Sequence, residues 1–115
     1  MRMERVARQV QMALAEALIA GLNDPRYRPV TITLVRVSPD LRHADVRFLP
    51  LAQQGDPEEI CKILNAASGH LQREIGRKIR MKFTPRLRFH VDVEGEQALA
   101  MNALLDRIRH ESEEE

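Results

Sequence analysis

The spacing of hydrophobic and polar residues predicts a helix and a β-hairpin in the first half of the chain. Between Met3 and Gly21, apolar residues recur at intervals of three and four, which is typical of an amphipathic helix. The residues of this stripe are Val6, Val10, Ala13, Leu14 and Ala17. Residues 30–37 (VTITLVRV) are rich in β-branched side chains and predict a strand. Residues 44–49 alternate between apolar and polar and predict a second strand, joined to the first by the turn Ser38-Pro39-Asp40.

The second half of the chain predicts two helices that meet at a kink, then a strand and a closing helix. Asp56, Pro57 and two glutamates form a typical helix start. The helical pattern then meets Ala67-Ser68-Gly69, where serine and glycine indicate a sharp kink, and a second helix is expected to run on to Thr84-Pro85. Residues 87–91 alternate as a third strand, and Phe48 and Phe89 fit inward positions of their strands. The closing helix is expected to carry the apolar residues Ala98, Met101, Leu104, Leu105 and Ile108.

This order predicts an α+β fold, α-β-β-α-(kink)-α-β-α, with a three-stranded mixed sheet and helices packed on one face. A chain of 115 residues suits a single domain, expected over residues 1–110, with a frayed acidic tail at 111–115. Cys61 is the only cysteine and is expected to be a small buried residue. Since no disulfide can form within the chain, no signal-peptide pattern occurs and no apolar run approaches the roughly 20 residues of a membrane span, we expect a cytoplasmic protein.

Catalytic chemistry is not indicated by the pattern of reactive side chains. The four histidines are dispersed, and none has metal-ligand spacing from another or from Cys61. Neither a Walker A loop nor a G-x-G-x-x-G motif occurs. The carboxylates cluster only at helix starts and in the tail, where capping or solvation explains them. We therefore expect no catalytic residues, no metal, no cofactor and no small-molecule substrate.

The charge of the chain is strongly polarised along its length, although the net charge is only +1. Residues 62–90 carry eight basic side chains and one acid, Glu74, which favours a polyanionic partner. On the predicted second helix, Arg73, Arg77 and Arg80 follow at i, i+4 and i+7 and would share one face. Lys78 and Lys82 would form a second row beside this face, and Arg86 and Arg88 would continue the positive surface into the strand. Glycine at the kink would let an RNA backbone approach closely, and helix N–H groups favour an anion there. The candidate RNA-binding residues are Ser68, Gly69, His70, Arg73, Arg77, Lys78, Arg80, Lys82, Arg86 and Arg88.

Other interpretations of the basic segment stay open at this point. A solvated helix face would need no partner, and a protein-interaction module would place the same cations against an acidic protein. An RNA-processing enzyme is a third class, which the missing acid–base and metal constellations disfavour. Because only four residues are aromatic, a stacking platform of the RRM type is not expected, and an RNA contact would depend mainly on phosphates.

Several short motifs occur together in a specific order. They are Asp24-Pro25-Arg26, Val37-Ser38-Pro39-Asp40-Leu41, Ala67-Ser68-Gly69-His70-Leu71, Gly76 and Thr84-Pro85-Arg86-Leu87-Arg88-Phe89. Over residues 3–108 this arrangement resembles the ribosome-binding factor A family, whose type II KH fold has an Ala-x-Gly kink in place of the usual GXXG loop. The chain departs from the family at Gln72, where a basic residue is common, and at Phe48-Leu49-Pro50-Leu51, where small polar residues are more usual.

The resemblance implies a non-catalytic assembly factor of the small (30S) ribosomal subunit. Such a factor would bind 16S rRNA in the free subunit, act in late 16S rRNA maturation including its 5′ end, and matter for growth in the cold. We also expect Gly69 to leave no room for a β-carbon on its nucleic-acid side. Finally, prolines near the strand ends and the expected burial of all apolar stripes predict a monomer.

Overall fold

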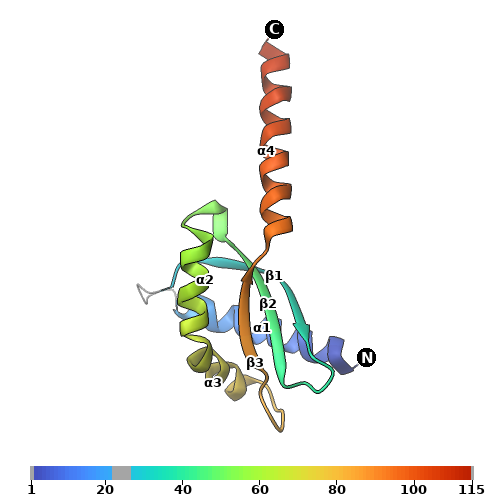
Figure 1. Ribbon diagram of the computed structural model, residues 1–115, viewed down its shortest axis with the longest axis vertical. Helices are drawn as coiled ribbons and strands as arrows, with labels where there is room; N and C mark the ends of the chain where they lie inside the picture. The colour runs from blue at the N-terminus through green and yellow to red at the C-terminus, as the bar shows by residue number, and fades with distance from the viewer. Residues whose placement is uncertain (1, 22–26, 115) are drawn as a thin grey trace.

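The computed structural model describes residues 2–21 and 27–114, and its element order is the predicted one (Figure 1). The elements are α1 (Arg2–Ala20), β1 (Val30–Val37), β2 (His43–Pro50), the 3-10 turn η2 (Leu51–Gln53), α2 (Pro57–Ala66), α3 (Ser68–Lys78), β3 (Arg86–Val91) and α4 (Val93–Glu114). The motif Asp24-Pro25-Arg26 lies outside the described residues. The strands are ordered β1-β2-β3, with β1 and β2 antiparallel and β2 and β3 parallel, which confirms the mixed sheet.

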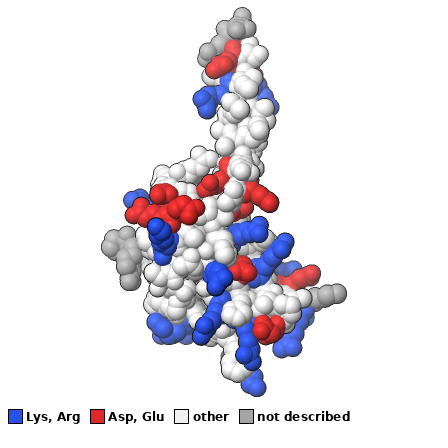
Figure 2. All heavy atoms as spheres, viewed as in Figure 1, with Lys and Arg blue, Asp and Glu red and all other residues white. Residues whose placement is uncertain are grey.

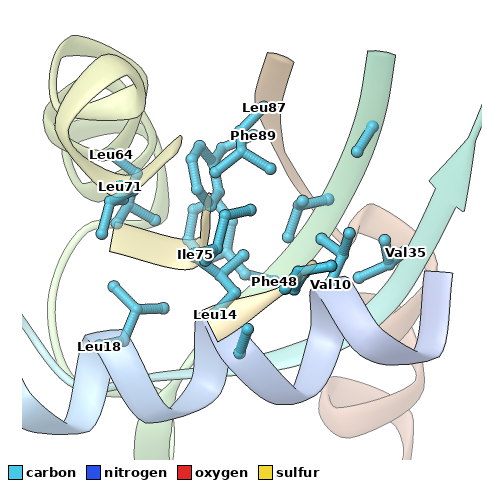
Figure 3. Close-up of a cluster of buried hydrophobic side chains, with 14 of the residues drawn as sticks. Val10, Leu14, Leu18, Val35, Phe48, Leu64, Leu71, Ile75, Leu87 and Phe89 are labelled. Carbon is cyan, nitrogen blue, oxygen red and sulfur yellow. The ribbon is translucent and has the colours of Figure 1, made fainter. Parts of the chain in front are cut away.

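Helices α1, α2 and α3 cover one face of the sheet, and the other face is open (Figure 1). The core lies between these layers, with side chains from the helices meeting those of β2 and β3 (Figure 3). Phe48 and Phe89 are 0% and 2% exposed, so their predicted inward positions are confirmed. Val10, Leu14 and Ile75 are fully buried against them. Both phenylalanines are therefore core residues and are unavailable for RNA.

Strand β1 contains a bulge that the sequence pattern did not predict. Its pairing with β2 shifts between Ile32, which pairs with Phe48, and Leu34, which pairs with Arg47. The bulge inserts one extra residue into β1. The next side chain after Ile32 that points toward the core is therefore Val35, three residues later, and not the residue two positions on. As a consequence Arg36 faces the open side of the sheet.

The predicted kink is confirmed. Helix α2 begins with Asp56, whose carboxylate accepts a hydrogen bond from the Glu58 backbone N–H at 3.1 Å, and it ends at Ala66. Ala67 has φ −91° and ψ 4°, and α3 then runs in a new direction (Figure 1). A β-carbon built on Gly69 would meet only Arg73 Nη1, at an ordinary 3.8 Å. Within the chain itself Gly69 therefore has room for a β-carbon, and any crowding there must come from a bound partner.

Helix α3 ends at Lys78, so the expected end at Thr84-Pro85 is wrong. Ile79 is extended, with φ −106° and ψ 124°, and is buried in the core. The chain then folds back onto α3: Gln72 Nε2 donates to the Thr84 carbonyl at 2.9 Å, and a β-carbon on Gly76 would lie 2.8 Å from Thr84 Oγ1. This packing of the following segment on α3 ends the helix early. It also gives Gln72, the departure from the family pattern, a structural role.

Helix α4 is present as predicted, but it does not close over the sheet. It projects from the body, and the molecule is 62 Å long (Figure 1). Its apolar residues Met101, Leu104, Leu105 and Ile108 are between 46% and 56% exposed, so the expectation that no apolar stripe stays exposed is wrong. The helix also continues to Glu114, beyond the expected boundary at residue 110. None of the helices within residues 2–21 and 27–114 is long and apolar enough to cross a membrane.

Candidate nucleic-acid interface

Helix α3 presents a basic face to solvent directly after the kink. Leu71 and Ile75 anchor its other face in the core and are 2% and 0% exposed. We define the α3 surface as Ser68, Gly69, His70, Arg73 and Arg77, of which all but the half-buried Ser68 are exposed. The first i→i−4 hydrogen bond of α3 runs from the Leu71 N–H to the Ala67 carbonyl at 2.9 Å. The N–H groups of the preceding first turn are those that a helix start leaves without intrahelical acceptors.

Two carboxylates contact the cations of α3. Glu74 Oε1 lies 3.4 Å from Arg77 Nη1, and Arg77 is 76% exposed, so this pair is open to solvent. Glu16 Oε2 of α1 lies 3.0 Å from Lys78 Nζ. Exposed ion pairs contribute at most about 1 kcal/mol, so phosphate can compete with Glu74 for Arg77. Lys78, in contrast, is held toward α1 and is separated from the row in which it was predicted.

Arg80 and Lys82 lie outside α3, because the helix ends before them. The prediction that Arg80 shares a helix face with Arg73 and Arg77 is therefore wrong. Both residues belong to the loop of residues 79–85, which we call the basic loop, and both are exposed. Among the residues that the structure describes, no carboxylate forms an ion pair with either of them.

Arg86 and Arg88 lie on a different face from the α3 surface. Leu87 and Phe89 of β3 point into the core beneath the helices, so the alternating residues Arg86 and Arg88 point to the open side of the sheet. The predicted continuous positive surface is thus divided in two by the sheet. Figure 2 shows basic side chains spread over the sheet and the lower end of the body, and acidic ones gathered where α2 and α4 begin.

Two further arginines on the open side were missed in the sequence. Arg36 pairs in register with Asp45, and Asp45 pairs with Arg88, so the three side chains form a row across the sheet. Asp45 Oδ1 contacts His90 Nε2 at 3.0 Å. We define the sheet surface as Arg36, Arg47, Arg86 and Arg88; a hollow of about 400 Å³ lies over part of it, lined in part by Arg36, Arg47 and His90. The alternation of β2 in the sequence could have placed Arg47 on the open side of the sheet. The side of Arg36 could not be predicted in this way, because the bulge in β1 interrupts the alternation.

Histidine, cysteine and carboxylate side chains do not cluster as metal ligands within the described part of the chain: no three of them come together as ligands in residues 2–21 and 27–114. Cys61 is half-buried on α2, and its thiol donates to the Phe89 carbonyl at 3.3 Å. Burial, assisted by the charge of Glu58, raises the pKa of Cys61. Burial therefore disfavours the thiolate, which is the reactive form of a cysteine.

Comparison with known proteins identifies the family. The sequence model described as ribosome-binding factor A matches residues 2–105. The chain belongs to the ribosome-binding factor A family. The ribosome-binding factor A of Azoarcus sp. (strain BH72) is 38% identical over 112 residues, covering 97% of this chain and 89% of that protein. That of Thioalkalivibrio sulfidiphilus is 40% identical over 106 residues, covering 92% and 82%.

Solved structures of family members show the same fold. The crystal structure of ribosome-binding factor A from Thermus thermophilus superposes with a TM-score of 0.66 at 31% identity, covering 76% of this chain and 93% of that one. A homology model of the Thermus thermophilus factor, fitted into a cryo-EM map of a 30S–RbfA complex, gives 0.61 at 32% identity and covers 73% and 88%. The KH-like fold expected from the sequence is confirmed.

Proposed function

We propose that the chain is a non-catalytic assembly factor that binds 16S rRNA in the free small (30S) ribosomal subunit. The observation that carries this proposal is the α3 surface, an exposed basic helix face that begins at a kink. The related Thermus thermophilus factor has been fitted into a 30S complex, which supports the same partner for this chain. Residues 1–110 would act as one KH-like domain in the cytoplasm, where subunits are assembled.

The α3 surface is suited to bind the RNA backbone at the kink. The N–H groups of Ser68, Gly69 and His70 lie in the first turn of α3, where open donors and the helix dipole favour a phosphate. Arg73 lies one turn later, and its guanidinium reaches to 3.8 Å from the position of a β-carbon on Gly69. A phosphate at the kink would therefore meet N–H donors and one arginine together. The basic loop and the sheet surface, including Arg86 and Arg88, would supply further phosphate contacts.

The finer biological role is part of the same proposal, and family membership supports it. We propose that the chain acts in late maturation of 16S rRNA, including its 5′ end, and that it supports growth in the cold. A role without catalysis is part of the same proposal.

Binding to protein-free 16S rRNA tests the proposal against its main rival. A protein-interaction module with an acidic protein partner would bind intact small subunits and keep binding after nuclease digestion of their rRNA. We expect binding to protein-free 16S rRNA, and loss of subunit binding after digestion. Failure to bind the protein-free rRNA, with binding to digested subunits retained, would favour the rival.

The variant Gly69→Ala distinguishes an effect on RNA affinity from an effect on the stability of the fold. Because Gly69 has helical φ and room for a β-carbon, alanine should stabilise the fold by about 0.5–1 kcal/mol. The added methyl group would project where the RNA backbone approaches, so affinity for 16S rRNA should fall. Thermal unfolding and a binding titration of the same sample check both expectations. A variant that binds as tightly as the unmodified protein would show that no phosphate approaches Gly69.

We propose that the chain is a monomer. The outer edge of β3, where another strand could pair, is occupied at Phe89 by the side chain of Asn65, which bonds both to its N–H and to its carbonyl. Sedimentation at micromolar concentration should therefore give the mass of a single chain. A stable dimer would contradict this expectation, and the exposed stripe of α4 would then be the surface to mutate first.

A further inference from the structure

The aromatic side chain of Phe83 lies exposed on the basic loop, outside the hydrophobic core. It is 63% exposed, in contrast to the buried Phe48 and Phe89. The Nζ atom of Lys82 lies 5.6 Å from the centroid of the Phe83 ring. Burial does not account for Phe83, so its ring is free to contact a partner.

Phe83 lines a hollow between α3 and the end of the sheet. The hollow has a volume of about 240 Å³ and is lined by Arg42, Gln72, Phe83, Thr84 and Arg86. A single water molecule needs only about 10–15 Å³, so the hollow has room for a larger group. Its walls are fixed by two hydrogen bonds, from Gln72 Nε2 to the Thr84 carbonyl at 2.9 Å and from the Arg86 N–H to the Arg42 carbonyl at 2.8 Å.

The charge around the hollow is positive. Lys82 lies over the ring, Arg42 and Arg86 line the same hollow as the ring, and no carboxylate is among the lining residues. Asp40, two residues from Arg42, is engaged with Ser38 Oγ at 2.6 Å and with the Arg42 N–H at 3.1 Å. An exposed ring among cations is the arrangement with which proteins stack a base of single-stranded nucleic acid while holding its phosphates.

We propose that this hollow is a nucleobase site, in which one unpaired base of the bound RNA stacks on Phe83 and the flanking phosphates contact Arg42, Arg86 and Lys82. The inference rests on the proposed RNA-binding function and adds a base contact to it. The hollow adjoins the two elements that carry the basic surfaces, because its lining residues Gln72 and Arg86 belong to α3 and β3. A single RNA segment could therefore contact both surfaces by passing Phe83.

A tryptophan at position 83 reports stacking directly. The chain has no tryptophan and one tyrosine, so Phe83→Trp introduces the only indole. On titration with protein-free 16S rRNA, its emission should be quenched in parallel with binding, since a base stacks on the ring. Met101→Trp is the matched control, because Met101 is 56% exposed on the projecting helix α4. Its emission should stay unchanged at the same saturation.

Truncation of the Phe83 side chain measures how much its ring contributes to the affinity for 16S rRNA. Phe83→Ala should weaken binding to 16S rRNA by about 5- to 150-fold, the effect of losing one base–aromatic stack. The dependence of affinity on salt should not change, because no charge is removed. Phe83→Leu keeps an apolar side chain and should lose nearly as much affinity as Phe83→Ala. Thermal unfolding of both variants should match the unmodified protein, since the ring is exposed.

The outcomes separate this inference from the proposed function. If Phe83→Trp is not quenched at saturation, or Phe83→Ala binds 16S rRNA undiminished, the nucleobase site is refuted while RNA binding stands. If quenching occurs with intact small subunits but not with protein-free rRNA, Phe83 contacts a ribosomal protein and the inference is also overturned. If the unmodified protein does not bind protein-free 16S rRNA at all, both proposals fail.

Discussion

Replacing Asn65 with alanine should lower the free energy of unfolding by about 2 kcal/mol. The Asn65 side chain occupies the outer edge of β3 at Phe89: its Oδ1 accepts a hydrogen bond from the Phe89 N–H at 2.8 Å, and its Nδ2 donates to the Phe89 carbonyl at 3.0 Å. Alanine leaves the Phe89 N–H without this acceptor, and the Phe89 carbonyl keeps only the weak thiol donor of Cys61 at 3.3 Å. The expected loss is net of the few tenths of a kcal/mol by which alanine favours the helix over asparagine.

Denaturant unfolding monitored by circular dichroism checks this expectation. Lys62→Ala is the matched control on the same helix, because Lys62 is exposed and should change the unfolding free energy by less than about 0.5 kcal/mol. The Asn65→Ala variant should also associate more readily at high concentration, since β3 then offers an unblocked edge. An unfolding free energy within about 0.5 kcal/mol of the unmodified protein would mean that solvent replaces both hydrogen bonds without cost.

The elements, their order and most of the core could be predicted because local periodicity determines them. Alternation in residues 44–49 and 87–91 correctly placed Phe48 and Phe89 in the core, since side chains of a strand alternate between two faces. The kink at Ala67 was predictable from the small residues around it. These features depend on neighbours in the sequence.

The errors arose where contacts between distant residues decide the backbone. Ile79 continues the helical stripe of Leu71 and Ile75, but it is extended, because Thr84 packs back on Gly76 and ends α3. The apolar spacing of α4 is typical of a packed helix, yet that helix projects from the body (Figure 1). Periodicity reports which residues share a face, and it does not report whether anything covers that face.

The sequence indicated which basic residues belong to the candidate site, but it predicted their arrangement in space only in part. The α3 residues Arg73 and Arg77 lie together as expected, whereas Arg80 lies on the basic loop. Arg86 and Arg88 are on the open side of the sheet, because β3 must turn Leu87 and Phe89 toward the helices. Charge along a sequence therefore predicted a basic protein surface correctly, but tertiary packing divided that surface.

The double variant Arg77→Ala/Arg80→Ala should weaken binding to 16S rRNA and flatten its dependence on salt. If Arg73, Arg77, Arg80 and Lys82 each neutralise one phosphate, they contribute roughly −3 to the slope of log affinity against log salt. Removing two of the four should make the slope less negative by about 1.5. Binding should weaken alike for different RNA sequences, because phosphate contacts do not read bases.

Both replaced side chains are exposed, so folding should be retained, with a change in unfolding free energy below about 0.5 kcal/mol for each. Arg107→Ala/Arg109→Ala is the matched control, since it removes the same charge from exposed positions on α4. Its slope should equal that of the unmodified protein. This control distinguishes a local phosphate contact from a general effect of net charge.

The most direct test of RNA docking through α3 and the basic loop is the salt dependence of binding to protein-free 16S rRNA, measured for these three proteins. The proposal predicts that only Arg77→Ala/Arg80→Ala has a slope flatter by about 1.5, together with lower affinity at every salt concentration. A folded Arg77→Ala/Arg80→Ala variant with the affinity and the slope of the unmodified protein would contradict it.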